Sequence, residues 1–398
     1  MRRLALAIVL ACNGMWWAEV ASSTPLIALQ ETQNCGGCHL PGRSQRPVLW
    51  RRCTLDCQGC HIDPAGAGPR SQWGYYYSQD QLAMVNFFKP QDPLDDESRF
   101  DVHYDGRIIQ RQTADANRTF PMSSEFSLRV RPFVEYLHLT YQAMMFGRIG
   151  DSSFRATRDD PRRYREKYSV MIDKLPMGLY ARTYRGQPMY GIRRSNHSLW
   201  IRERIGLDQF ATTEASEVGG TPNVPYLRGS MMTGDPYAEP EDRQKGTSSH
   251  FGLRGVSFGW HLNGSTWDTQ SEKAKVSMRA FGGGLSPWDF IFMGERNWRS
   301  VEEFDAPAGA DGFASQATRL HPSSEITEWT AAWAGIPGVM GGYVQEELHD
   351  ATADSLRRNL FIDFHPIPFV QFEIWRRFET GTRNLADTLG VLHLYADF

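Results

Sequence analysis

Two short cysteine–histidine clusters near the start of the chain are the residues best suited to chemistry. Residues 34–39 read NCGGCH and residues 56–61 read DCQGCH, so the string Cys-x-x-Cys-His occurs twice. Two thiols at this spacing can add to the two vinyl groups of one porphyrin, and an imidazole directly after them can ligate the iron. The pattern predicts two covalently attached haem c groups, held by Cys35, Cys38, His39, Cys57, Cys60 and His61.

Other chemistry remains open for these cysteines. The spacing Cys35-x2-Cys38-x18-Cys57-x2-Cys60 also fits a zinc ribbon, and the two pairs could be disulfides or redox dithiols. A zinc ribbon has no need of a histidine directly after each second cysteine, which favours haem. Cys53 adds the spacing of some iron–sulfur sites, but such a cluster would compete with haem for Cys57 and Cys60. We expect Cys53 to be a free or intermolecular thiol.

The segment 24–98 that holds both motifs is rich in Gly and Pro and has little periodicity, which predicts a small diheme cytochrome c segment. Its two histidines, His39 and His61, would be the proximal iron ligands. The distal ligands must then be other residues. For each histidine outside the segment, the alternative to iron ligation is a hydrogen bond between the imidazole and a carboxylate. The candidate distal ligands are Met84, His103, His138 and His197.

The N-terminus has the character of an export signal. Arg2 and Arg3 precede a short apolar stretch that begins at Leu4, and small residues follow at 21–23. This stretch is too short to span a membrane, which predicts a signal peptide over residues 1–23. Export fits haem, because c-type haem is attached outside the cytoplasm, whereas most zinc ribbons are intracellular.

From residue 99 onwards, polar and apolar residues alternate. The stretches RFDVHYDGRI at 99–108, KAKVSMRA at 273–280 and FVQFEIWR at 369–376 show the period of two that is typical of strands. The chain ends VLHLYADF, with an aromatic last residue that resembles the closing strand of outer-membrane barrels. A soluble array of β-sandwiches is the alternative. We predict a mainly β fold in which residues 99–398 form an antiparallel transmembrane barrel of about 12–16 strands.

The polar face of these strands would line the barrel lumen. His103 and His138 both fall on such faces, together with neighbouring polar residues. Basic residues on the same inferred faces could make the lumen anion-selective, or they could simply be solvated. These basic residues are Arg129, Lys273, Lys275 and Arg279.

Parts of the chain resemble a known family. CQGCHIDPAGAG at 57–68, followed by WGYYY, resembles the haem-motif segment of exported proteins from bacteria with extracellular electron transfer. The stretch 170–208 resembles a region that follows in the same proteins. The architecture is similar to the fused cytochrome–porins of iron-oxidising bacteria, although those carry one haem motif and this chain carries two.

The resemblance implies electron transfer across or at the outer membrane. Its partners would be periplasmic cytochromes, outer-membrane lipid and an external electron donor or acceptor. The implied reaction at the outer surface is the oxidation or reduction of iron or another metal. The haem segment would lie at the periplasmic side or in the lumen. Two alternatives remain, a diffusion porin with a haem-binding plug or sensor and a soluble periplasmic c-type carrier. The net charge of −3 gives no sign of a nucleic-acid partner, and no hydrolase or phosphate-loop motif is present.

Overall fold

A computed structural model gives the fold of the chain. The predicted signal peptide, both haem motifs, His197 and Phe398 lie outside the residues that it describes. The described residues are 74, 83–85, 99–132, 136–147, 164–187, 189–192, 199–207, 211–221, 224–255, 259–304, 323–351, 354–381 and 384–397.

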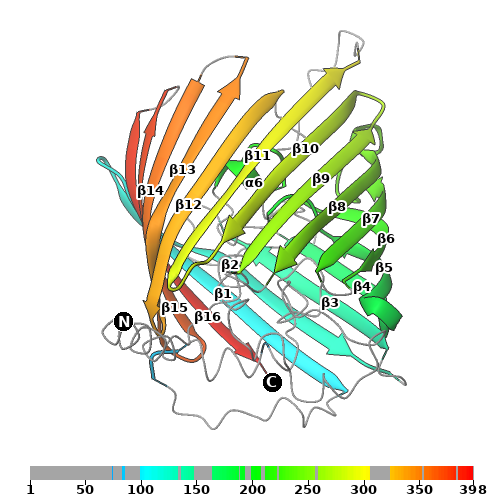
Figure 1. The fold of residues 1–398 in the computed structure, drawn as a ribbon, viewed down its shortest axis with the longest axis horizontal. Helices are drawn as coiled ribbons and strands as arrows, with labels where there is room; N and C mark the ends of the chain where they lie inside the picture. The colour runs from blue at the N-terminus through cyan, green and yellow to red at the C-terminus, as the bar shows by residue number, and fades with distance from the viewer. Residues whose placement is uncertain are drawn as a thin grey trace, which may run out of the picture.

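The strands form one closed antiparallel barrel (Figure 1). Each strand pairs with its neighbours along the chain, and β1 (Phe100–Gln112) pairs with β16 (Leu385–Asp397) to close the ring. The prediction of a mainly β barrel is confirmed, with 16 strands at the upper end of the expected range. The strands between them are β2 (Asn117–Val130), β3 (Leu137–Phe146), β4 (Tyr164–Leu175), β5 (Leu179–Gly186), β6 (Thr213–Gly220), β7 (Pro225–Gly234), β8 (Lys245–Gly255), β9 (Trp260–Gln270), β10 (Ala274–Leu285), β11 (Phe290–Glu303), β12 (Ser324–Ile336), β13 (Val339–Asp350), β14 (Asp354–Ile367) and β15 (Val370–Thr380).

The alternation in the sequence becomes an inside and an outside. On β1 the side chains of Asp101 and His103 are buried, whereas Phe100, Tyr104 and Ile108 are exposed. Successive side chains of a strand point to opposite faces, so the polar set lines the lumen and the apolar set faces outward. An apolar outer face on a closed ring is suited to lipid, because closure leaves no unpaired backbone edge. The protein is therefore an outer-membrane barrel.

The two ends of the barrel differ in the length of their connections. At one end, β12 joins β13 through residues 337–338 and β14 joins β15 through residues 368–369. At the other end, residues 187–212 join β5 to β6 and residues 304–323 join β11 to β12. Outer-membrane barrels have short periplasmic turns and longer extracellular loops. The start of β1 and the end of β16 therefore lie at the periplasmic end.

Helical structure is sparse in the described part of the chain. Its helices are η4 (Pro176–Gly178), α6 (Trp200–Glu203) and η5 (Pro240–Asp242). None of them has the length and apolar character needed to cross a bilayer.

A charge on the outward face should cost most near the middle of the membrane. Ile374 on β15 faces outward and pairs with Ile362 of β14. We expect Ile374→Arg to lower the free energy of unfolding in lipid vesicles by about 2–4 kcal/mol, as read from urea titrations. Thr380→Arg, on the same face at the extracellular rim, should cost only about 0–1 kcal/mol. Equal losses at both positions would show that this face does not meet lipid as described.

Candidate functional site in the barrel lumen

Part of the connection between β5 and β6 lies inside the barrel. We call residues 189–192 and 199–207 the inner segment. Its apolar side chains are buried, and Figure 1 shows its helix α6 within the ring of strands. Tyr190, Leu199, Trp200 and Ile201 are each at most 1% exposed, so the segment narrows the lumen.

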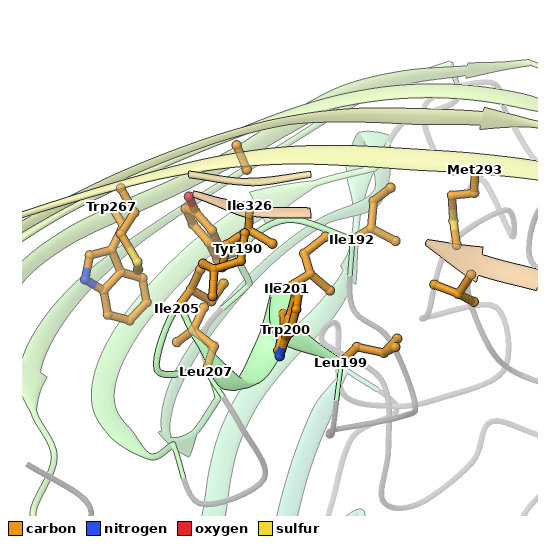
Figure 2. Packing of buried hydrophobic residues seen from close by; sticks show 14 of the residues in the cluster. Tyr190, Ile192, Leu199, Trp200, Ile201, Ile205, Leu207, Trp267, Met293 and Ile326 are labelled. Carbon is orange, nitrogen blue, oxygen red and sulfur yellow. The ribbon is translucent and has the colours of Figure 1, made fainter. Parts of the chain in front are cut away.

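The inner segment packs on an apolar stretch of the barrel wall (Figure 2). The rings of Tyr190 and Trp267 of β9 meet edge to face, with centroids 6.2 Å apart. Ile291 of β11 and Ile326 of β12 are completely buried in the same cluster. A lumen face that contacts water would carry polar residues, so this stretch is apolar because the inner segment covers it.

This packing overturns one prediction from the sequence. Val276 and Met278 of β10 face the lumen and are buried, whereas Lys275 and Arg279 face outward and are exposed. Arg279 pairs there with Asp268, and Lys273 lies outside the strand, where it pairs with Asp242. The assignment of Lys273, Lys275 and Arg279 to an anion-selective lumen is therefore wrong. Arg129 does face the lumen, where it pairs with Asp101.

Wall side chains hold the backbone of the inner segment. The N–H of Ile192 donates to Glu295, and the N–H of Trp200, the first residue of α6, donates to Glu346. The N–H of Gly191 donates to Ser265 Oγ at 2.8 Å. The first N–H groups of a helix have no partner within it, and a buried N–H without one is costly. These bonds therefore fix the segment to the wall.

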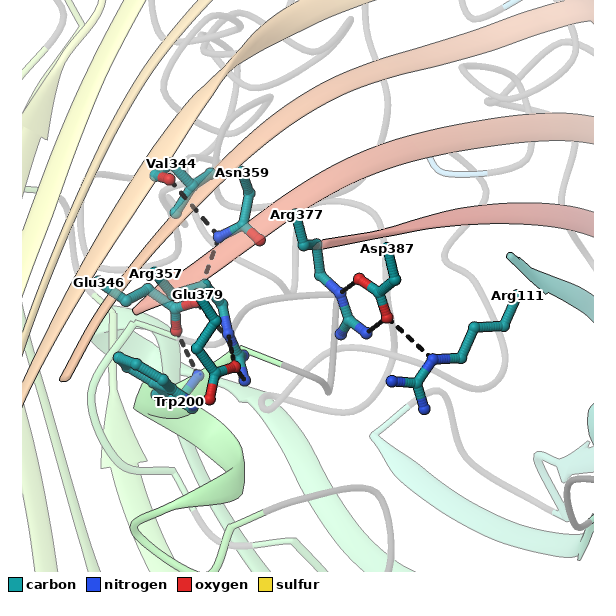
Figure 3. Close-up of polar contacts among 9 residues, drawn as sticks. All are labelled: Arg111, Trp200, Val344, Glu346, Arg357, Asn359, Arg377, Glu379 and Asp387. Carbon is teal, nitrogen blue, oxygen red and sulfur yellow. Dashed lines mark hydrogen bonds and ion pairs between the residues drawn. The ribbon is translucent and has the colours of Figure 1, made fainter. Parts of the chain in front are cut away.

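Ion pairs stiffen the wall beside this anchor (Figure 3). The guanidinium of Arg357 lies 4.4 Å from the ring centre of Trp200, and its Nη2 donates to Glu379 at 3.0 Å. On the next strands Asp387 accepts from Arg377 Nε at 2.7 Å and from Arg111 Nε at 2.8 Å. The network crosses β14, β15, β16 and β1 in the extracellular half of the lumen.

A second polar chain follows the same strands in the periplasmic half. His393 Nε2 lies 2.6 Å from Asp105, and His393 Nδ1 lies 2.6 Å from Gln371. The amide of Gln371 donates to Asp363 at 2.9 Å, and Asp363 lies 3.2 Å from His365 Nε2. This wall is therefore rich in carboxylates and imidazoles. In the described parts of the chain, however, no three such groups could share a metal ion.

The predicted histidines lie where the alternation put them. His103 and His138 are buried on the lumen faces of β1 and β3. His138 Nε2 is 3.0 Å from Asp173, as the competing interpretation expected. Two further lumen histidines, His365 and His393, were not predicted as site residues. Both stand on polar faces of alternating stretches, and this alternation could have identified them.

The predicted cytochrome segment contacts the barrel at residues 83–85. Met84, one of the candidate distal ligands, is 45% exposed. Its backbone N–H donates to the carbonyl of His365 at 2.9 Å, and that of Val85 donates to Pro366 at 3.2 Å. Residues 83–85 therefore lie at the periplasmic end of β14.

Comparison with solved structures finds outer-membrane proteins. A loop L8 deletion mutant of OmpT from Vibrio cholerae matches with a TM-score of 0.53 at 11% identity, over 75% of this chain and 99% of that one. In-vitro folded OmpT matches with a TM-score of 0.51 at 10% identity, over 76% and 99%. Identities this low show the fold alone. No protein-family model and no curated protein matches the chain. The likeness supports the closed-barrel fold and does not bear on the haem motifs.

Releasing the inner segment should widen the lumen. Glu346→Ala removes the acceptor of the Trp200 N–H, while Glu347→Ala changes the neighbouring side chain on the outward face. We expect the first variant to have a larger and noisier single-channel conductance in planar bilayers. The second should behave as the unmodified protein does. An unchanged conductance for Glu346→Ala would mean that this bond does not hold the segment.

Proposed function

We propose that the chain is an outer-membrane barrel of porin type that carries two haem c groups in its N-terminal segment and moves electrons across the outer membrane. The observation that carries the proposal is the order along the chain. Two Cys-x-x-Cys-His motifs precede the first strand of a closed barrel, and an inner segment narrows the lumen of that barrel. A diffusion channel needs no such motifs, and a soluble carrier needs no apolar outer face.

The donor groups in the chain suit haem. The thiol pairs Cys35/Cys38 and Cys57/Cys60 would hold the porphyrins, and His39 and His61 would ligate the irons. The wall of the barrel offers further imidazoles. Nδ1 of His138 and Nδ1 of His365 are buried and have no hydrogen-bond partner among the described residues. A buried imidazole nitrogen without a partner is costly, and ligation of iron would satisfy it.

The dimensions of a barrel explain why such a pairing would be useful. Its apolar band is about 25 Å tall, so an electron needs a carrier within it. Bound haem supplies reversible one-electron chemistry. Residues 83–85 lie at the periplasmic end, which suits donation or acceptance by periplasmic cytochromes. The other end would serve an external donor or acceptor, which includes iron as a candidate substrate.

A second candidate function is a diffusion porin whose N-terminal segment is only a plug or sensor. The fold likeness to outer-membrane proteins favours this candidate, because it requires no haem. Charged side chains on the lumen faces also fit a solute path. The soluble periplasmic carrier does not fit a closed barrel with an apolar outer face.

Electron transfer should depend on the proximal histidines. We expect liposomes that carry the protein and enclose a reduced viologen dye to bleach when impermeant ferricyanide is added outside. The double variant His39→Ala/His61→Ala should bleach far more slowly, because both irons lose a protein ligand. Pyridine haemochrome should report about two haems per unmodified chain.

Sugar leakage measured in the same liposomes separates the two candidates. Bleaching at the rate of sugar leakage, with or without the motif histidines, would leave the diffusion porin as the function. A colourless, zinc-loaded protein would rule out haem.

The distal ligands can be tested in the same preparation. We expect that replacing at least one of His103, His138, His197 and His365 with Ala shifts the visible spectrum or the midpoint potential. His138 and His365 come first, because each has a nitrogen without a partner. His393→Ala is the control, since both of its ring nitrogens already have partners. If none of the four variants differs from this control, the distal ligands do not come from these histidines.

A further inference from the structure

Two turns at the periplasmic end of the barrel have nearly the same sequence. Residues 336–339, between β12 and β13, read IPGV, and residues 367–370, between β14 and β15, read IPFV. In both turns the isoleucine pairs with the valine. The residue after the proline has a φ of 73° at Gly338 and 72° at Phe369. A proline followed by a residue of positive φ is typical of a type II turn, so the two turns share one backbone geometry and differ in one side chain.

This geometry does not by itself require a glycine. A bulky residue rarely adopts a positive φ, because its Cβ is crowded there. Nevertheless Met177, Trp288 and Phe369 each follow a proline in a turn at the periplasmic end, with φ of 61°, 54° and 72°. The barrel therefore tolerates side chains at this position of its turns, and the glycine at 338 has a further reason.

That reason is the space that residues 83–85 occupy. We call these three residues the strap. A Cβ at Gly338 would lie 2.7 Å from the carbonyl oxygen of His365, 2.7 Å from Met84 Cγ and 2.9 Å from the backbone nitrogen of Met84. Non-bonded carbon atoms keep a separation of about 3.5–4.0 Å, so a side chain at 338 would displace a neighbour. The strap can move more easily than His365, whose N–H is bonded to the carbonyl of Gly338 at 2.7 Å.

The strap is bonded to the end of β14 through its backbone. β14 continues to Ile367, beyond the residue that pairs with the start of β13. There the N–H of Met84 donates to the carbonyl of His365 at 2.9 Å, and the N–H of Val85 donates to the carbonyl of Pro366 at 3.2 Å. Addition of an extended segment to the edge of a sheet is a common mode of recognition, in which the backbone bonds hold the segment.

The connection to the barrel does not force this contact. Residues 86–99 join the strap to β1, and a connection of this length can span about 45–50 Å. In the ring, β14 is separated from β1 by β15 and β16, which corresponds to three strand spacings or about 15 Å. The chain could therefore leave residues 83–85 at many other places, and their position on β14 comes from the contacts themselves.

We propose that the periplasmic end of β14 and the turn at Gly338 form a docking site for the N-terminal segment of this chain, which binds through the strap. Ala83 is 6% exposed, whereas the side chains of Met84 and Val85 are 45% and 47% exposed, so the strap is held by its backbone and by its smallest side chain. Gly338 is the positioning residue, because its missing side chain leaves the docking site open. Docking fixes one point of the segment that carries both Cys-x-x-Cys-His motifs. It needs no haem, and only its use in electron transfer rests on the proposed function.

The test disturbs the contact from both sides in the full chain and measures amide hydrogen exchange at Met84 and Val85 by mass spectrometry. Gly338→Ala adds the Cβ that would part the bond between Met84 and His365. Ala83→Glu leaves the barrel unchanged and places a charge at a buried position of the strap, which is costly. The gel shift between unboiled and boiled samples confirms that the barrel of each variant is closed.

Each variant has a matched control. Gly178→Ala places the same side chain at a φ of 66° in the turn between β4 and β5, where its Cβ would also crowd a backbone carbonyl, that of Thr221 at 2.8 Å. It therefore carries the same strain at a turn far from the strap along the ring. Val85→Glu adds the same charge to the strap at a side chain that is already exposed.

Both amides should be protected in the unmodified protein. We expect them to exchange about tenfold faster or more in Gly338→Ala and in Ala83→Glu, because local opening then requires less free energy. Gly178→Ala and Val85→Glu should exchange as the unmodified protein does. The docking site is refuted if the two amides are unprotected in the unmodified protein, or if each variant exchanges at the rate of its control.

The liposome assay examines the use of the site separately. If docking positions the haem groups, Gly338→Ala and Ala83→Glu should bleach the enclosed dye more slowly than their controls, with the pyridine haemochrome of the unmodified protein. Unchanged bleaching with faster amide exchange would reject this use and leave the docking site in place. A protein without haem would reject the electron-transfer function, and amide exchange alone would then decide the docking site.

Discussion

The structure depends on the need to satisfy every backbone hydrogen bond where there is no water. A sheet in lipid can meet this need only by closing, and the pairing of β1 with β16 does so from His103↔Asp397 to Gln112↔Thr388. Closure fixes which residues share the lumen, because side chains alternate strictly along each strand. It also brings residues from the two ends of the barrel sequence together, as in the contact between Asp105 and His393.

Closure creates a lumen, and the inner segment decides what that lumen can do. A ring of sixteen strands is wide enough for an aqueous channel. Here the aromatic side chains of Tyr190 and Trp200 are buried inside it, and Glu295 and Glu346 hold the backbone that carries them. The lumen is thus narrowed on the side of β9 to β14, while the polar chain around His393 lines another part of it.

The sequence predicted the barrel well because the signal is local. Alternation over β1 and β15 places Asp101 and Gln371 inside, and the structure agrees. The same reasoning failed on β10. The alternation of Val276 with Lys275 is equally regular there, but the apolar residues face the lumen and the charged residues face outward. No local pattern reveals that the apolar residues of a distant connection will cover that wall.

The distribution of charge links the barrel to its proposed role. The carboxylates and imidazoles of β14, β15, β16 and β1 lie where residues 83–85 meet the barrel, through the bond from Met84 to His365. The carboxylates of this wall are paired in part with Arg107, Arg111 and Arg377, so its charges stabilise the barrel wall as well as any group that the N-terminal segment would place beside it.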